Sequence, residues 1–166
     1  GEFVGILVNR YKDRIKSWEL WNEPDIKAYW SGSAEDLAKL VKISAQAVRK
    51  ADPTAMIVCP GLAGHTEFTL ALFKDHGISP YVDVVNIHNY FETWNPASIE
   101  NIVPYVNTIA DIIKQYGNNQ SIWMAEVGYS TFRRNGHVSD WSSAYYDYEH
   151  TPKFQAVQLI RTLTLL

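Results

Sequence analysis

Apolar residues follow two alternating spacings along the chain, and each spacing predicts a different kind of element. Residues that recur about every three to four positions predict helices, and short uninterrupted apolar runs predict strands. The helical stretches are residues 3–11, 33–52, 66–76, 95–117 and the segment that follows Thr151-Pro152. The strands are residues 15–21, 56–59, 82–87 and 121–125. This alternation of helices and strands predicts an α/β fold.

Local signals place several of the helix ends. Ser33 and Asp36 have the spacing of a capping box, and Pro53 ends the helix that they begin. Thr66 is expected to cap the next helix. Pro104 interrupts an apolar stripe of helical period, so we expect a kink or a fresh helix start at that point.

The predicted strands are continuous apolar runs, without the alternation of a strand that has one wet face. Such runs are typical of a parallel sheet that is covered on both faces. Cys59 is the single cysteine of the chain and lies at the end of one run, so we interpret it as a buried strand residue. The pattern alone leaves two architectures open, an open doubly wound sheet and a closed barrel.

The composition of the chain argues against two classes of binding partner, nucleic acids and membranes. The chain has 166 residues, is 46% hydrophobic and carries a formal net charge of −3. Nucleic-acid binding normally leaves a basic footprint, and a membrane helix needs about 18 apolar residues in a row, so neither partner is expected. Both ends of the sequence have the pattern of a helix interior, from which we expect a fragment of a longer protein. The oligomeric state and the compartment stay open.

Polar side chains close three of the four predicted strands. The first strand ends in Asn22 and Glu23, and Glu126 closes the fourth. His88 and Tyr90 follow the third strand two positions apart, so they point to the same side. In a parallel barrel, the carboxyl ends of the strands share the face on which active sites lie. The sequence therefore predicts that these side chains lie close together.

Two carboxylates on one face suit the cleavage of glycosides. At a separation of about 5 Å, one can act as nucleophile while the other protonates the leaving group. The Tyr90 hydroxyl is the candidate donor that keeps the nucleophile ionised. Aromatic residues make up 13% of the chain, and those that follow the third and fourth strands are expected to line a sugar cleft. They are Trp94, Tyr129, Trp141 and the cluster at residues 145–148.

Three motifs in this order resemble a known group of enzymes. They are Trp-Asn-Glu-Pro at residues 21–24, His-x-Tyr at 88–90, and Glu126 followed by a glycine and a tyrosine. With these motifs the chain resembles the retaining glycoside hydrolases of clan A over nearly its whole length. The resemblance implies a partial (β/α)8 TIM barrel in which the chain supplies strands 4 to 7 with their helices. Residues 1–166 would then be a fragment of a single catalytic barrel.

The resemblance also implies a role for each residue. Glu23 would be the acid/base and Glu126 the nucleophile of a double displacement through a covalent glycosyl-enzyme. Asn22 would contact the sugar 2-hydroxyl, with His88 and Tyr90 also at the substrate. The resemblance implies that the substrate is a poly- or oligosaccharide. It implies no cofactor and no metal.

Three points stay open in this interpretation. Glu19 is expected to point into the barrel and to pair with a basic residue on one of the barrel strands that lie outside this sequence. The alternatives to a glycosidase are a carbohydrate-binding barrel remnant without catalysis and a different barrel enzyme that uses paired carboxylates. Whether the fragment by itself is active also stays open.

Overall fold

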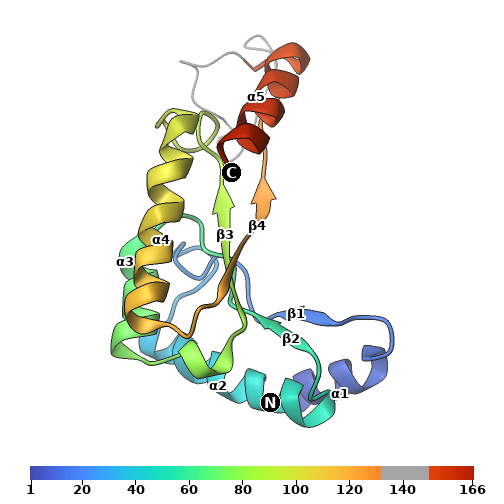
Figure 1. Ribbon diagram of the computed structural model, residues 1–166. Helices are drawn as coiled ribbons and strands as arrows, with labels where there is room; N and C mark the ends of the chain where they lie inside the picture. Colours follow the sequence, from blue (N-terminus) through green and yellow to red (C-terminus); the bar gives the residue numbers. More distant parts are fainter. Residues whose placement is uncertain (132–149) are drawn as a thin grey trace. The chain divides into compact units, whose positions relative to one another are not determined.

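The computed structural model describes residues 1–131 and 150–166. The predicted alternation of helices and strands is confirmed there (Figure 1). In chain order the main elements are α1 (Glu2–Tyr11), β1 (Ser17–Glu19), α2 (Ala34–Ala51), β2 (Met56–Val58), α3 (Thr66–Leu70), β3 (Val84–Asn89), α4 (Ile102–Tyr116), β4 (Ser121–Val127) and α5 (Pro152–Leu165). A π-helical turn, η1 (Ala71–Asp75), continues α3, and two short 3₁₀ turns, η2 (Ser79–Tyr81) and η3 (Ile99–Asn101), precede β3 and α4.

The four strands form one sheet in the order β1-β2-β3-β4. β1 pairs in parallel with β2, and β2 in parallel with β3. The arrows of β3 and β4 point the same way in Figure 1. Isolated parallel bridges join Asn22 to Gly61 and Leu62 to Ile87, so the pairing continues past the strand ends. The chain therefore has an α/β fold with a parallel sheet.

The chain divides into two compact units. The first unit comprises Gly1–His88 with Thr108–Ala125, and the second comprises Asn89–Asn107 with Glu126–Leu166. The core of the first unit is built from α2, β2 and β3, where Leu37, Val41, Ile57 and Ile87 are each 0% exposed. Cys59 is also fully buried, as the sequence predicted, and burial raises the pKa of its thiol. This core supports the strand ends that carry Glu23 and His88.

The second unit buries an unusual share of polar side chains. Ile99 and Ile102 are 0% exposed, but so is Gln158 on α5, and Glu92 is only 3% exposed.

No helix among the described residues is both long and apolar enough to span a membrane.

The helix ends follow the local signals in most cases. Ser33 accepts a hydrogen bond from the Asp36 N–H, and the Asp36 carboxylate accepts one from the Ser33 N–H, so the predicted capping box is formed. α4 begins at Ile102, and Pro104 lies in its first turn, where a missing N–H leaves no helical bond unmade. The fresh helix start at this proline is thereby confirmed. The cap predicted at Thr66 is wrong, because His65 occupies the N-cap position and Thr66 is already helical.

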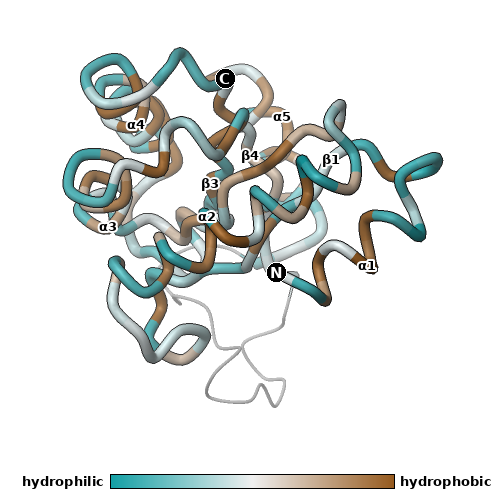
Figure 2. The backbone as a smooth tube through the Cα atoms, turned by 90° about the horizontal axis from the view of Figure 1, so that it is seen from below, coloured by the Kyte–Doolittle hydropathy of each residue, from teal (hydrophilic) through white to brown (hydrophobic). Residues whose placement is uncertain are grey.

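One expectation about burial is also wrong. β3 is buried along its whole length, as a covered strand should be, but β4 alternates exposed and partly buried residues. β4 therefore has one open face, which a run of apolar residues did not reveal. Hydrophobic residues recur along α1 (Figure 2), yet that helix buries only Val8, while Phe3 is 74% and Ile6 63% exposed.

Candidate active site

Glu23 lies beyond the end of β1 in a strained backbone conformation. β1 ends at Glu19, so the strand is not regular as far as Glu23. Glu23 has φ of 44°, in the left-handed region, and it precedes Pro24, which disfavours helical conformations in the residue before it. Such a conformation costs on the order of 1–3 kcal/mol and persists only where the surroundings enforce it. Here the Glu23 N–H donates to the Gly61 carbonyl at 2.8 Å, which fixes the turn.

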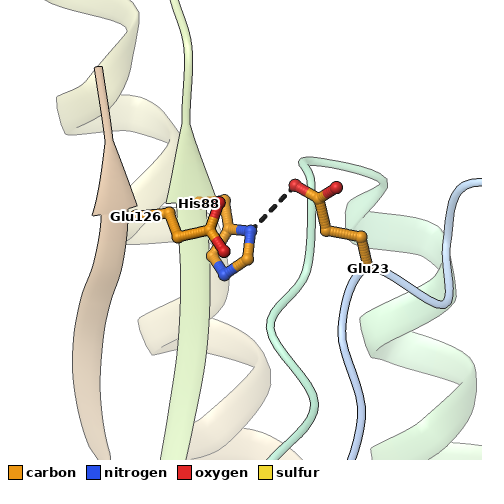
Figure 3. Close-up of side chains that lie close together, drawn as sticks. All are labelled: Glu23, His88 and Glu126. Carbon is orange, nitrogen blue, oxygen red and sulfur yellow. Dashed lines mark hydrogen bonds and ion pairs between the residues drawn. The ribbon is translucent and has the colours of Figure 1, made fainter.

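The Glu23 carboxylate is bonded to the imidazole of His88 (Figure 3). The distance from His88 Nδ1 to Glu23 Oε1 is 2.8 Å, and the side chains are 1% and 12% exposed. A bond this sheltered fixes the direction in which the carboxylate points. His88 is thus held from two sides by protein groups, since its other nitrogen, Nε2, lies 3.4 Å from the Asn86 amide.

The amide of Asn86 determines which nitrogen of His88 carries the proton. Asn86 Oδ1 accepts from the Ala125 N–H at 3.0 Å, so Nδ2 is the donor atom that faces Glu19 and His88. His88 Nε2 therefore accepts, and His88 Nδ1 holds the hydrogen that is donated to Glu23. A neutral imidazole in this tautomer can donate to Glu23 in both states, because a protonated carboxyl still has an acceptor oxygen.

Glu19 belongs to the same set of contacts. Its Oε1 accepts from the Gly61 N–H at 2.8 Å and from Asn86 Nδ2 at 3.1 Å. Both of these donors are neutral N–H groups, and the basic partner expected for Glu19 on a strand outside this sequence stays a prediction. A hydrogen-bonded series thus runs from Glu19 through Asn86 and His88 to Glu23, all within the first unit. Glu19 and Asn86 were not candidates from sequence, although Asn86 stands two positions before His88 on the same side of the strand.

In the second unit, Glu126 is held by Tyr90. The Tyr90 hydroxyl donates to Glu126 Oε2 at 2.9 Å, as expected for the donor to a nucleophilic carboxylate. Trp94 packs against the Tyr90 ring with centroids 4.6 Å apart, and 45% of Trp94 remains exposed. A Cβ at Gly128 would lie 3.2 Å from Tyr90 Cε1, so glycine allows the backbone to approach the Tyr90 ring closely.

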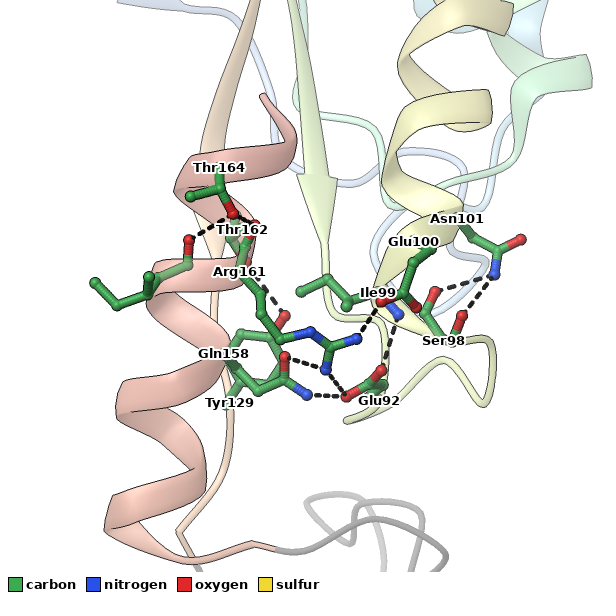
Figure 4. A network of polar contacts seen from close by, with 11 residues as sticks. Glu92, Ser98, Ile99, Glu100, Asn101, Tyr129, Gln158, Arg161, Thr162 and Thr164 are labelled. Carbon is green, nitrogen blue, oxygen red and sulfur yellow. Dashed lines mark hydrogen bonds and ion pairs between the residues drawn. The ribbon is translucent and has the colours of Figure 1, made fainter.

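The turn that carries Tyr90 and Trp94 is anchored by a buried carboxylate, Glu92 (Figure 4). Glu92 accepts from the Ile99 N–H at 2.9 Å and from the side chains of Gln158 and Arg161 on α5. Its backbone is left-handed, with φ of 60°. Arg161 also binds Glu100. This network fixes the loop after β3 to α5 within the second unit, a role that no sequence motif signalled.

The remaining candidate site residues differ in their exposure to solvent. Asn22 is exposed and, with Trp21 and Tyr29, lines an open pocket of about 560 Å³ in the first unit. Tyr129 turns its hydroxyl to Thr162 on α5 at 3.3 Å, and burial raises the pKa of that hydroxyl. Contact of Asn22 or Tyr129 with substrate stays a prediction. Trp141 and residues 145–148 lie outside the described residues.

The contacts of His88 bear on whether the first unit could hold a metal. A histidine ligand presents a lone pair to the ion, whereas His88 Nδ1 carries a hydrogen toward Glu23. The arrangement therefore suits proton transfer and orientation of a carboxylate better than ligation by that nitrogen.

Ionisable groups at the carboxyl ends of parallel strands occupy the place where α/β enzymes carry out their chemistry. Glu23 follows β1 and Glu126 lies near the end of β4, so both carboxylates are at the carboxyl ends of strands in this α/β fold. The chain belongs to the glycosyl hydrolases family 39, whose sequence profile matches residues 2–146. This family lies in clan A, so the resemblance read from the three motifs is confirmed.

Individual proteins are similar to this chain in sequence or in fold. A β-xylosidase from Caldicellulosiruptor saccharolyticus is 38% identical over 97 residues, which are 54% of this chain and 19% of that protein. A β-D-glucuronidase from Dictyoglomus thermophilum has a TM-score of 0.65 at 19% identity, covering 99% of this chain and 25% of its own. A family 39 β-xylosidase from Caulobacter crescentus has a TM-score of 0.59 at 22% identity, covering 78% and 30%. The chain therefore spans at most 30% of the length of these three proteins.

Proposed function

We propose that this chain is the part of a retaining glycoside hydrolase barrel that carries both catalytic carboxylates, Glu23 and Glu126. The observation that carries the proposal is that each carboxylate has a different fixed donor. The His88 N–H donates to Glu23, and the Tyr90 hydroxyl donates to Glu126. Two carboxylates with unlike surroundings are what a retaining mechanism needs, since one must remain ionised while the other cycles its proton.

The reaction proceeds in two displacements. Glu126 attacks the anomeric carbon while Glu23 gives its proton to the departing oxygen, which leaves a covalent glycosyl-enzyme. Glu23, now ionised, takes a proton from water, and the resulting hydroxide releases the sugar with its original configuration. Tyr90 orients Glu126 for attack, and His88 orients Glu23 in both of its protonation states. Asn22 contacts the sugar beside Glu23.

The architecture that fits this mechanism is a (β/α)8 barrel in which β1 to β4 correspond to strands 4 to 7. A retaining enzyme needs its two carboxyl groups about 5–5.5 Å apart, whereas an inverting enzyme needs about 6.5–9.5 Å. We expect the shorter separation between Glu23 and Glu126 in a crystal structure of the complete protein. A separation above about 6.5 Å would argue for inversion.

A curated relative indicates the substrate class to test first. That protein is named a β-xylosidase, and its matched segment is 38% identical to this chain. Aryl β-xylosides and xylo-oligosaccharides are therefore the first substrates to test with the complete protein.

The test combines two carboxylate variants with a covalent label. Glu126→Ala should lose turnover, and a 2-fluoro xyloside should label the wild-type protein on the peptide that holds Glu126. Glu23→Ala should lose about 10²–10⁴-fold on substrates with poor leaving groups, the range ascribed to general acid catalysis. Glu67→Ala, at a carboxylate that is 78% exposed on α3, is the matched control and should keep full activity.

Three results would contradict the proposal. They are undiminished turnover by Glu126→Ala, a label on another residue, and loss of wild-type activity on chelation of divalent metals. Sugar binding without any turnover by the wild-type protein would support the carbohydrate-binding remnant.

A further inference from the structure

Asp25 makes an unusual set of contacts for a residue in a turn. Its Oδ1 accepts from the Ala63 N–H at 3.0 Å, and its Oδ2 accepts from the Gly64 and His65 N–H groups, each at 3.1 Å. One carboxylate thus takes up three consecutive backbone donors from a loop far away in the sequence. A local Asx turn would bond to the residues that directly follow the aspartate, and Asp25 does not do this.

The loop that Asp25 holds, residues 61–65, is also bonded to both parts of the Glu23–His88 pair. The Gly61 carbonyl accepts from the Glu23 N–H at 2.8 Å, and the Leu62 carbonyl accepts from the His88 N–H at 2.8 Å. Residues 61–65 therefore connect the backbone of Glu23 to the backbone of His88. Any movement of this loop would change the relative positions of the carboxylate and the imidazole.

The backbone of Glu23 needs such a restraint. Its left-handed φ of 44° before a proline is a conformation that the chain does not adopt by preference. On one side Glu23 is fixed by the parallel bridge between Asn22 and Gly61. On the other side the next fixed point is Asp25, whose charged carboxylate makes stronger bonds to N–H groups than a neutral acceptor would.

We propose that Asp25 is a positioning residue for the acid/base. It clamps the turn of Glu23 to residues 61–65, so that the Glu23 carboxylate stays on His88 and aimed at the departing oxygen. This inference rests on the proposed function, because it assumes that Glu23 is the proton donor. Asp25 itself exchanges no proton and touches no substrate in this role.

The test uses leaving-group dependence, which a merely structural role would not change. Asp25→Ala and Asp25→Asn are compared in the complete protein on two aryl β-xylosides, one with a dinitrophenolate leaving group and one with an unsubstituted phenol. Dinitrophenolate departs without protonation, so only the phenol requires a well-placed Glu23. Misplacement by about 1 Å can lower a rate about 10²-fold, so we expect kcat/KM to fall about 10- to 100-fold on the phenyl substrate. On the dinitrophenyl substrate it should hardly change.

Matched controls separate this inference from the proposed function. Asp75→Asn, at an exposed aspartate in η1, should behave as wild type on both substrates. Glu23→Ala is measured in parallel. If Glu23→Ala itself shows no leaving-group dependence, the proposed function is overturned, and the role of Asp25 with it. If Glu23→Ala shows the dependence and the Asp25 variants lose both substrates equally or neither, only the positioning role is overturned.

A second measurement reports on the clamp without any activity. Amide hydrogen exchange at Ala63, Gly64 and His65 should accelerate in Asp25→Asn, because the amide group puts a donor where a carboxylate oxygen accepted. The same amides should keep their protection in Asp75→Asn. Unchanged protection in Asp25→Asn would overturn the clamp even if Asp25→Ala failed to fold.

Discussion

At the scale of single residues, Gly61 is a position where added volume meets side chains of the site directly. A Cβ at Gly61 would lie 2.2 Å from His88 Nε2 and 2.8 Å from Glu19 Oε1, closer than real Cβ contacts occur. Gly61→Ala therefore must displace the imidazole or the loop itself. Overpacking of this kind typically lowers the free energy of unfolding by about 1–3 kcal/mol.

We expect that loss in chemical denaturation, together with changed imidazole signals of His88 in NMR spectra. Gly5→Ala is the control, because nothing lies within 4 Å of its Cβ and it sits inside α1. That control should raise the stability by about 0.5–1 kcal/mol, since alanine is the better helix former. Equal stabilities of Gly61→Ala and wild type would show that the site relaxes without cost.

Which site residues the sequence could predict depends on where their partners lie. The places of Glu23, His88 and Glu126 near strand ends were predictable, because each follows or closes an apolar run. The roles of Gly61 and Asp25 were not, since they depend on contacts with residues more than 25 positions away in the sequence. No local spacing encodes such a contact.

At the scale of elements, α2 offers a clean test of a local signal. Ser33 and Asp36 form a reciprocal cap at its start, and Ser33 lies in an extended conformation, as an N-cap residue should. Removing a serine cap typically lowers the free energy of unfolding by about 0.5–2 kcal/mol. We expect this loss from Ser33→Ala in urea denaturation. Ser31→Ala, at an exposed serine just before the cap, should stay within about 0.5 kcal/mol of wild type, and equal losses would contradict the cap assignment.

Helix starts were predictable where one side chain satisfies a nearby N–H. Ser33 and Thr151 both cap as the sequence indicated, each by a bond to an N–H three residues ahead. The cap predicted at Thr66 was wrong because the turn before this residue is fixed by Asp25. The Asp25 carboxylate accepts a hydrogen bond from the His65 N–H, although it comes from another loop. A long-range contact there replaced the local signal and moved the cap by one residue.

Strand burial was harder to predict than strand position. β3 and β4 are both apolar runs, yet β3 is covered on both faces and β4 on one. A run of apolar side chains indicates that a segment can form a buried strand. How exposed the strand is depends on which other elements pack against it. The same reasoning applies to α5, where Ile160 is 61% and Leu163 67% exposed.

At the scale of the whole molecule, the order of elements and motifs carried more information than any single stretch. The alternation predicted the α/β fold with a parallel sheet, and the three motifs predicted the clan to which the matched family belongs. The pattern could not predict the division into two compact units, because each of β3, α4 and β4 contributes residues to both. The spacing of apolar residues predicts where a helix or strand lies. It does not predict which other elements each part of that helix or strand will contact.

Acid stability is a property of the whole molecule that several carboxylates set together. The Arg161 side chain, with help from Ser98, lowers the pKa of Glu100 from its ordinary 4.5 to about 2. Hydrogen bonds from Ser33 lower the pKa of Asp36, and those from Thr54 lower the pKa of Asp52. A carboxyl group with a lower pKa in the folded state stabilises that state fully above its ordinary pKa. This contribution is lost as the pH falls through the folded value.

The unfolding midpoint should therefore fall as the pH is lowered from about 5 toward 2, most of all where Glu100 is still ionised in the folded protein but protonated in the unfolded one. Glu100→Gln removes that difference, so its stability should depend less on pH than that of the wild type below about pH 4.5. Asp111→Asn, at an exposed carboxylate on α4, should keep the wild-type slope. Thermal unfolding of the three proteins between about pH 2 and 7 measures these slopes. Parallel curves for Glu100→Gln and wild type would mean that the Arg161–Glu100 pair persists in the unfolded chain or does not stabilise the folded one.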